Sequence, residues 1–415
     1  MKITQLSYSD NGGGAARAAF RIHQALRATG TDSTFVAHKT SASDWTIQGE
    51  RSAAVKILSN LAPRVTAVMT RLLRTENQII HSPAVFPSGR LRTLNASEAN
   101  ILHMHWVQGE MLSIADIGRL TKPLVWTLHD MWAFCGAEHT TEDFRWQDGY
   151  CKNNRPPYES GFDLNRWVWN RKRRHWVDPI QIVTPSKWLA QCVRTSALMQ
   201  EWPVQVIPNT LDTERWKPIE QSLARDLLGL PKDVPIILFG AIDGVRNRLK
   251  GFDLLQVAIE HLRGELKEAN LVVFGQTAPR HSLDLGFPIH YVGHLFDDLS
   301  LRALYSAADV MVVPSRQEAF GQTASEAHAC GTPVVAFNTC GLPDIVSHEI
   351  TGYLARPFDS EDLARGIMWI LSDRRRLSLL RTNSRERAVN LFAYEVVAEQ
   401  YREVYDRVLI KNPSP

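Results

Sequence analysis

Short apolar runs alternate with amphipathic helical patterns along the whole chain. Several of the runs are apolar on both faces, as strands buried inside a parallel sheet must be. The predicted strands are residues 2–7, 33–38, 101–106, 124–129, 180–185 and 205–208 in the first half, and 235–241, 270–275, 290–293, 310–314 and 333–337 in the second. The predicted helices are residues 14–30, 252–264, 300–308, 323–330, 361–373, 374–390 and 394–411.

This alternation predicts an α/β fold with two doubly wound, Rossmann-like parallel sheets in series. A polar stretch punctuated by prolines, residues 209–235, marks the break. We expect an N-terminal domain over residues 1–212, a C-terminal domain over residues 213–390, and a last segment, residues 391–415, that packs back on the first domain. Ligands of such sheets bind beyond the carboxyl ends of the strands, so the chemistry is expected in loops that follow strands and face a cleft between the domains.

Composition and charge narrow the classes of protein. The 415 residues are 44% hydrophobic and 22% charged, as in a globular protein, and the net charge of +3 gives no reason to expect a nucleic-acid partner. The five cysteines are scattered without a CxxC pair, which argues against a disulfide framework and a structural zinc site. The N-terminal segment turns polar too early for a secretory signal, and no apolar stretch is long enough to span a membrane. We therefore expect a cytoplasmic protein.

Two glutamates with seven residues between them, Glu318 and Glu326, follow the predicted strand at residues 310–314. Gly321 opens the next predicted helix, so Glu318 lies in the loop before the helix and Glu326 about two turns inside it. Carboxylates accept hydrogen bonds from vicinal hydroxyls, which suits Glu326 to a ribose and Glu318 to a sugar. In the alternative interpretation, Glu318 only favours the helix start and Glu326 lies on a solvated face.

The turn between the two glutamates offers backbone donors. The amides of Phe320, Gly321 and Gln322 would present hydrogen-bond donors and the positive end of the helix dipole to a diphosphate. The spacing of the two acids therefore suits a nucleoside diphosphate sugar, with one acid toward each end of it.

Further segments occur in a fixed order around this motif. They are FG at residues 239–240, KGFDLL at 250–255, NLVVFG at 270–275, YSAAD at 305–309, GTPVVAF at 331–337, GLPDIV at 341–346 and TGYL at 351–354. With the paired glutamates, this set resembles the second domain of the retaining GT-B glycosyltransferases of family 4, closely over residues 235–373 and more loosely in the first half. The resemblance implies two Rossmann-like domains facing a cleft, a nucleoside diphosphate sugar as donor, and hexosyl transfer with retention at the anomeric carbon.

The resemblance also implies roles in the donor site. Lys250 corresponds to the lysine that neutralises the diphosphate, although the same residue could be a solvated lysine at a helix start. The family usually places an arginine directly after the glycine of the first strand of this domain, whereas Gly240 is followed here by Ala241. Arg248 or Arg246 could substitute from the loop. No D-x-D motif occurs, so no metal ion is expected in the site and no cofactor beyond the donor itself.

A glycine-rich loop follows the first predicted strand. The resemblance places Gly13 and Gly14 of this loop against the donor phosphates, and a plain tight turn is the alternative. A dinucleotide fingerprint would need a third glycine where Arg17 stands, which disfavours an NAD-dependent oxidoreductase.

Histidines gather at the ends of two predicted strands. His129 resembles the family's strand-end histidine and could contact the transferred sugar or an acceptor hydroxyl; the alternative is a core histidine paired with Asp130. His103 and His105 share one strand face, where a packed polar strand end is favoured over a metal site formed with His129.

Basic and aromatic segments suggest a second kind of partner. Residues 171–174 are all basic and lie among Trp167, Trp169 and Trp176, and residues 56–74 repeat apolar side chains at helical spacing with basic ones alongside. Such a surface suits anionic headgroups or a lipid diphosphate, which predicts peripheral contact with the inner face of the cell membrane. Solvated basic helices packed on the sheet are the alternative, and nucleic-acid stacking fits less well with the small net charge.

These observations predict transfer of a hexosyl unit to a hydroxyl of a glycan or lipid-linked saccharide, in the synthesis of bacterial surface polysaccharide or exopolysaccharide. The residues expected to carry catalysis are His129, Lys250 and Glu318. Two alternatives stay open. A nucleotide-sugar epimerase or hydrolase of the same fold would need no acceptor, and a non-catalytic sugar-nucleotide-binding protein would never release nucleotide.

Overall fold

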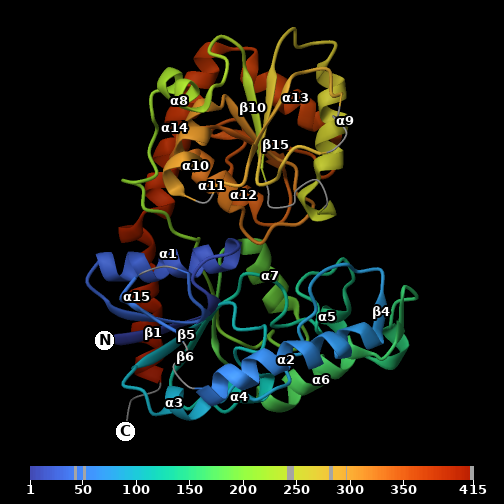
Figure 1. The fold of residues 1–415 in the computed structure, drawn as a ribbon, viewed down its shortest axis with the longest axis vertical. Helices are drawn as coiled ribbons and strands as arrows, with labels where there is room; N and C mark the ends of the chain where they lie inside the picture. Colours follow the sequence, from blue (N-terminus) through green and yellow to red (C-terminus); the bar gives the residue numbers. More distant parts are fainter. Residues whose placement is uncertain (42–43, 50–52, 241–246, 280–283, 296, 412–415) are drawn as a thin grey trace. The chain divides into compact units, whose positions relative to one another are not determined.

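The computed structural model describes residues 1–41, 44–49, 53–240, 247–279, 284–295 and 297–411, with the backbone alone described for residues 53–61 and 63. The chain divides into two compact units, Met1–Ile207 with Val397–Pro415, and Pro208–Val396 (Figure 1). Residues 208–212 and 391–396, which we had assigned outside the second domain, pack together within the second unit. The Leu211 amide donates to the Phe392 carbonyl oxygen at 2.7 Å, which explains this difference.

The first unit is built on a seven-stranded parallel sheet in the order β3-β2-β1-β5-β6-β8-β9. Its strands are β1 (Lys2–Ser9), β2 (Asp32–Lys39), β3 (Ile47–Gln48), β5 (Ile101–Met104), β6 (Leu124–Thr127), β8 (Gln181–Thr184) and β9 (Val204–Val206), and a separate antiparallel pair is formed by β4 (Leu73–Thr75) and β7 (Glu159–Gly161). The helices are α1 (Gly14–Ala28), α2 (Ala53–Leu72), α3 (Leu91–Asn95), α4 (Ile114–Ile117), α5 (Arg145–Asp148), α6 (Leu164–His175), α7 (Lys187–Thr195) and most of α15 (Tyr394–Lys411), with the 3-10 turn η1 (Lys152–Asn154).

The second unit has a six-stranded parallel sheet in the order β12-β11-β10-β13-β14-β15. Its strands are β10 (Ile236–Gly240), β11 (Asn270–Phe274), β12 (Ile289–Gly293), β13 (Val310–Val313), β14 (Val334–Phe337) and β15 (Gly352–Ala355). Its helices are α8 (Gln221–Leu228), α9 (Phe252–Leu262), α10 (Asp298–Ala307), α11 (Gln322–Ala329), α12 (Leu342–Ile345), α13 (Ser360–Leu371) and α14 (Arg374–Phe392), with the 3-10 turn η2 (Arg248–Lys250).

Both faces of the second sheet are covered, and the strand sequences explain why. Successive side chains of β13 point to opposite faces, so Met311 and Val313 join the core beneath α10 and α11, while Val310 and Val312 join the core beneath α9 and α13 (Figure 1). The predicted α/β fold with two Rossmann-like parallel sheets is confirmed. The strands β3, β4, β7 and β15 were not predicted: β3, β4 and β7 are short and contain no apolar run, and β15 contains a glycine and an alanine, which are depleted in strands.

In the described part of the chain, no helix has both the length and the apolar character that a membrane crossing requires.

Candidate donor and acceptor sites

The strand order of the second unit reverses between β10 and β13. The chain runs outward from β10 through β11 and β12 on one side, and from β13 through β14 and β15 on the other. Ligands of open α/β sheets bind at such a switch point, beyond the carboxyl ends of the two strands. The loop around η2 is the next described segment after β10, and the loop after β13 leads to α11, so both loops belong to the edge of the sheet where the two strands end.

These two loops hold the predicted donor residues in contact. The Lys250 ammonium donates to Oε2 of Glu318 at 2.6 Å, and the Ser315 hydroxyl donates to the same oxygen at 3.3 Å. The side chains are 30% and 19% exposed for Lys250 and Glu318, so a ligand can still reach the pair. A fixed cation beside a carboxylate, at the switch point, can bind a phosphate and a hydroxyl of one ligand. No role was predicted for Ser315, although it is the first polar residue after β13.

The contact depends on a close approach of the two loops. Gly251 has φ +67°, and a Cβ at this position would lie 1.9 Å from the carbonyl oxygen of Pro314, so only glycine fits. Arg316, in the loop after β13, also holds the two loops together. Its amide donates to the Leu249 carbonyl at 2.8 Å, and its guanidinium binds both carboxylate oxygens of Asp253 at 2.7 Å.

Helix α11 begins at the predicted place. Gly321 is its N-cap with φ +110°, and the amides of Ala324 and Ser325 make the first intrahelical bonds to the Gly321 carbonyl. The amides before them therefore precede the first bonded turn, where helices bind anions. The Phe320 side chain is buried edge-on against Phe392, with ring centroids 5.7 Å apart, which anchors the loop.

Glu326 lies in the second turn of α11 and is 2% exposed. Oε2 of its carboxylate accepts a hydrogen bond from the Tyr305 hydroxyl at 2.9 Å. The alternative interpretation of Glu326 as part of a solvated helix face is therefore wrong. The contact of Tyr305 with Glu326 was not predicted, because the two residues lie on different helices, α10 and α11.

Arg248 lies in η2, two residues before Lys250. The residue is exposed, and its carbonyl oxygen accepts from the Arg316 guanidinium at 2.9 Å. The alternative, Arg246, and Ala241 lie outside the described residues.

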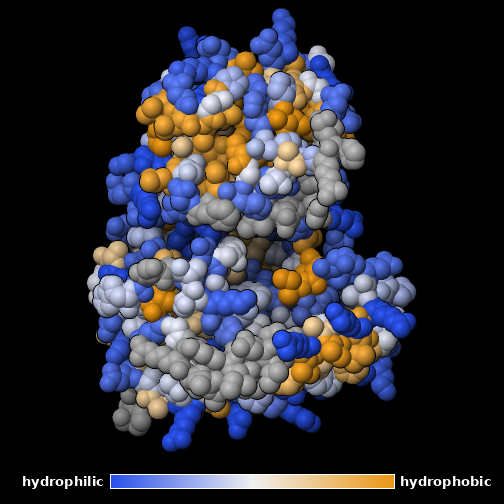
Figure 2. Space-filling view, in the orientation of Figure 1, coloured by the Kyte–Doolittle hydropathy of each residue, from blue (hydrophilic) through white to orange (hydrophobic). Residues whose placement is uncertain are grey.

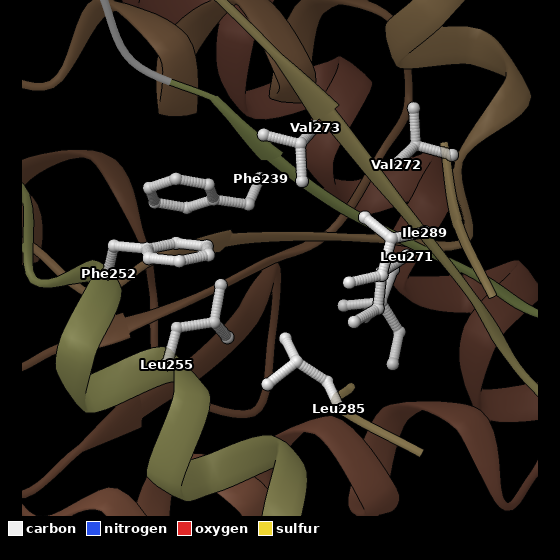
Figure 3. A pocket seen from close by; sticks show the side chains of 9 residues that line it. Phe239, Phe252, Leu255, Leu271, Val272, Val273, Leu285 and Ile289 are labelled. Carbon is white, nitrogen blue, oxygen red and sulfur yellow. The ribbon is translucent and has the colours of Figure 1, made fainter. Parts of the chain in front are cut away.

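A small cavity lies elsewhere in this unit, between α9 and the sheet (Figure 3). Phe239, Phe252, Leu255 and Leu285 are among its lining residues, all of them apolar, and its volume is about 10 Å³. A space of this size holds at most one water molecule, and its lining offers no side-chain partner for one. The cavity is therefore a gap in the core and not a ligand site.

The first unit has its own switch point, between β1 and β5. The loop after β1 carries Gly12 with φ +94° and Gly13 with φ +130°, and no heavy atom lies within 4 Å of a Cβ built on either residue. Gly14 is the first residue of α1. The positive φ angles require glycine, while the open space around this backbone would admit a ligand.

His129 follows β6, two strands from this loop, and is half-buried. Its Nε2 lies 3.1 Å from Nδ1 of His105, and burial lowers its pKa to about 4, so the imidazole is neutral at pH 7. The predicted alternative, a pair with Asp130, is wrong: the Asp130 carboxylate accepts from Trp106 Nε1 at 2.8 Å and contacts His139 Nδ1 at 2.6 Å.

The polar strand end that we favoured over a metal site is confirmed for His103 and His105. His103 bonds the Tyr405 hydroxyl and the Thr127 hydroxyl, both at 2.8 Å, and His105 bonds Gln5 at 2.7 Å besides His129. Both histidines therefore use both ring nitrogens in hydrogen bonds between side chains.

The predicted basic, tryptophan-bearing surface is only partly correct. In α6, Trp169 and Lys172 are buried, and Trp176 directly after the helix is buried too. The Lys172 ammonium donates to the carbonyl oxygens of Trp132, Cys135 and Gly136, and burial lowers its pKa to about 7. One face of α6 therefore belongs to the core, because helical periodicity and not composition decides which side chains face inward.

Arg173 and Arg174 of α6 are exposed, and further exposed residues of the predicted surface lie on α2. Val65, Val68 and Leu72 are 47%, 56% and 56% exposed. Arg64 and Arg71 lie exposed beside them, and Arg74 follows in β4. Figure 2 shows the apolar side chains over the C-terminal half of α2 with hydrophilic ones between them. We call these six residues the α2 face.

Two Rossmann-like units, each with candidate binding residues at the switch point of its sheet, define a two-domain protein of the doubly wound α/β class. Residues 12–215 match the family described as Glycosyltransferase Family 4, and residues 223–387 match the family described as Glycosyl transferases group 1. Together the two matches span most of the chain, which therefore belongs to the group 1, family 4 glycosyltransferases.

Relatives support this assignment. A D-inositol 3-phosphate glycosyltransferase of Xylanimonas cellulosilytica is 34% identical over 227 residues, 51% of this chain and 53% of that protein. The chain thus spans about half the length of the curated relatives it matches. Among solved structures, sucrose-phosphate synthase from Thermosynechococcus elongatus superposes with a TM-score of 0.67 at 21% identity, covering 99% of this chain and 100% of that one. The Anabaena protein HepE in complex with UDP and glucose has a TM-score of 0.67 at 18% identity, covering 98% and 100%. These structures share the GT-B fold.

Proposed function

We propose that the protein is a retaining glycosyltransferase, which moves a hexosyl unit from a nucleoside diphosphate sugar to a hydroxyl group of an acceptor. The observation that carries this proposal is the contact of Lys250 with Glu318 at the switch point of the second sheet, beside the N-terminus of α11. The HepE structure, which holds UDP and glucose, supports a donor of this class.

Each group has a task that follows from its chemistry. The Lys250 ammonium and the start of α11 stabilise the charge that develops on the departing diphosphate. Glu318, held by Lys250 and Ser315, accepts hydrogen bonds from hydroxyls of the transferred sugar. Glu326 accepts from the ribose. As the family resemblance implies, the acceptor hydroxyl attacks the face from which the diphosphate leaves, and Lys250 supplies the positive charge without a metal ion.

A panel of UDP-, GDP- and ADP-sugars tests the proposal. The true donor, at one hundred times its dissociation constant, should stabilise the folded protein by about 2.7 kcal/mol in thermal unfolding. Nucleoside diphosphate should then be released only when an acceptor saccharide is added, and equally well in EDTA. Donor consumption without acceptor would instead indicate the hydrolase or epimerase, and binding without any release would indicate a binding protein.

Glu326→Gln is expected to weaken donor binding by roughly 10- to 100-fold, because a charge-assisted hydrogen bond contributes about 1.5–3 kcal/mol. Glutamine keeps the size of the side chain and can still accept from the Tyr305 hydroxyl. Isothermal titration with the nucleoside diphosphate measures the effect, with the exposed Glu361→Gln as the matched control on the same unit. An unchanged dissociation constant would remove Glu326 from the donor site.

We also propose that the acceptor is a glycan or lipid-linked saccharide at the inner face of a bacterial membrane, in surface polysaccharide or exopolysaccharide synthesis. The α2 face supports this proposal, since exposed aliphatic side chains among arginines suit an anionic bilayer surface.

Replacing Arg64, Arg71 and Arg74 together by glutamate should lower binding to anionic vesicles by at least about 100-fold, at about 1 kcal/mol for each arginine. Co-sedimentation with vesicles containing phosphatidylglycerol measures the loss. Replacing the exposed Arg263, Arg374 and Arg375 of the other unit in the same way controls for net charge. Equal loss in both variants, or equal binding to neutral vesicles, would contradict docking by the α2 face.

A further inference from the structure

A line of buried polar side chains crosses the interior of the first unit and ends at His129. Its members come from the strands β1, β5 and β6, from the residue directly after β5, and from the helix α15, which lies beside this sheet in Figure 1. These members are Gln5, His103, His105, Thr127, Tyr401 and Tyr405. Apolar cores seldom contain so many polar groups unless each is satisfied, so the line specifies one arrangement of hydrogen bonds.

The decisive link is the pair formed by Gln5 and His105. The amide oxygen of Gln5 lies 2.7 Å from Nε2 of His105, and the amide nitrogen of Gln5 donates to the Tyr405 hydroxyl at 3.4 Å. Gln5 and Tyr405 are completely buried, and His105 is 1% exposed. No solvent therefore competes for these bonds.

The amide oxygen of Gln5 determines which ring nitrogens donate and which accept in the hydrogen bonds of His105 and His129. An amide oxygen can only accept, so the ring hydrogen of His105 is on Nε2. Burial holds the pKa of His105 well below its usual value, and the ring is neutral with this single hydrogen. Nδ1 of His105 is then an acceptor, and Nε2 of His129, 3.1 Å away, must donate to it. Because the His129 ring is neutral as well, its Nδ1 carries a lone pair.

We propose that Gln5 is a positioning residue for His129: through His105 it sets the ring hydrogen of His129 on Nε2 and so leaves Nδ1 as a hydrogen-bond acceptor at the carboxyl edge of the sheet. An acceptor nitrogen binds a hydroxyl through the hydroxyl's own hydrogen. His129 thus selects a sugar or acceptor position that bears O–H, and it discriminates against fluorine or a methyl ether at the same position. The selection of a hydroxyl-bearing position rests on the proposed function, whereas the tautomer of His129 does not.

If donors and acceptors were reversed in these hydrogen bonds, substitutions of Gln5 would have different effects. If the Gln5 amide nitrogen donated to His105, the hydrogens of both rings would sit on Nδ1. A carboxylate at position 5 can only accept, so Gln5→Glu keeps the acceptor for Nε2 of His105 and is incompatible with the opposite direction. The Tyr405 hydroxyl must then donate to the carboxylate instead of accepting from the amide. Gln5→Met keeps the approximate volume and removes the acceptor.

Two measurements test the proposal. Long-range ¹⁵N–¹H spectra of the wild-type protein without ligand should show the hydrogen on Nε2 in both His105 and His129. A hydrogen on Nδ1 of His129 overturns the proposal even if the protein is an active glycosyltransferase, and the expected tautomer stands even if transfer activity is never found.

Kinetics supply the second test. Gln5→Met should lower kcat by about 10- to 100-fold, because the buried Nε2 hydrogen of His105 loses its acceptor. The dissociation constant of the nucleoside diphosphate should be unchanged, and Gln5→Glu should recover most of the loss in kcat. Ser33→Ala is the matched control, since it removes a partner of another buried histidine, His23, at 2.9 Å. An equal loss in Ser33→Ala and Gln5→Met, or a loss in Gln5→Glu as large as in Gln5→Met, would mean that Gln5 only stabilises the fold. The wild-type spectra decide the matter should the Gln5 variants not fold.

Discussion

Replacing Lys250 by alanine is expected to lower the rate of sugar transfer by roughly 100- to 1,000-fold, equivalent to about 2.7–4 kcal/mol of transition-state stabilisation. The ammonium contacts Glu318 at 2.6 Å at the switch point, so it is placed where the charge of a leaving diphosphate would develop. The variant also deprives Glu318 of its cation, which weakens the carboxylate's hold on the sugar. We therefore expect most of the loss in kcat and a smaller loss in donor affinity.

Single-turnover and steady-state rates with the donor found in the panel measure this effect. Lys267→Ala removes an exposed lysine of the same unit and should leave the rate within about twofold. Lys250→Arg retains the charge but not the compact ammonium, and an intermediate rate is expected. A Lys250→Ala protein with more than about a third of the wild-type rate would contradict the assignment of this lysine to catalysis.

The sequence predicts the second unit well because its strands are continuous apolar runs. β10, β11, β13 and β14 are buried on both faces, and all four were predicted to within two residues at each end. The neighbouring site residues follow from the same logic, since loops after parallel strands meet at one edge of the sheet. β15 has the same length as β13 and β14, but it contains a glycine and an alanine, which are depleted in strands, and it was not predicted.

Contacts between distant segments are harder to predict. No spacing in the sequence indicates that Gln5 lies against His105, because Gln5 belongs to β1 and His105 follows the neighbouring strand β5, which is far away along the chain. A polar residue inside an otherwise apolar strand indicates that a buried hydrogen bond exists, but it does not indicate which residue is the partner. Composition also misled us at Lys172, whose place in a run of basic residues suggested exposure, whereas its ammonium is enclosed by three carbonyl oxygens.

The loops that carry Lys250 and Glu318 extend from β10 and β13, and a polar cluster joins the amino ends of the same two strands. Asp309, directly before β13, accepts from the Arg225 guanidinium at 2.7 Å and from the Ile236 amide at the start of β10 at 2.8 Å. Its other oxygen accepts from Arg381 at 3.1 Å and Gln221 at 3.0 Å. One carboxylate thereby ties α8 and α14 to the register of the two central strands.

Asp309→Ala is expected to lower the free energy of unfolding of the second unit by about 3–5 kcal/mol, because Arg225, only 4% exposed, would keep a buried charge without its carboxylate. Urea unfolding of the full chain, with hydrogen exchange in the peptides that cover β10 and β13, measures the loss where it should occur. Asp226→Ala is the matched control on α8. Asp226 also pairs with a cation at 2.7 Å, Lys232, but the two side chains are 54% and 48% exposed, so the expected loss is below about 1 kcal/mol. Equal losses in the two variants would show that Asp309 does not hold the strands in register, and the donor residues at their far ends would then need another source of rigidity.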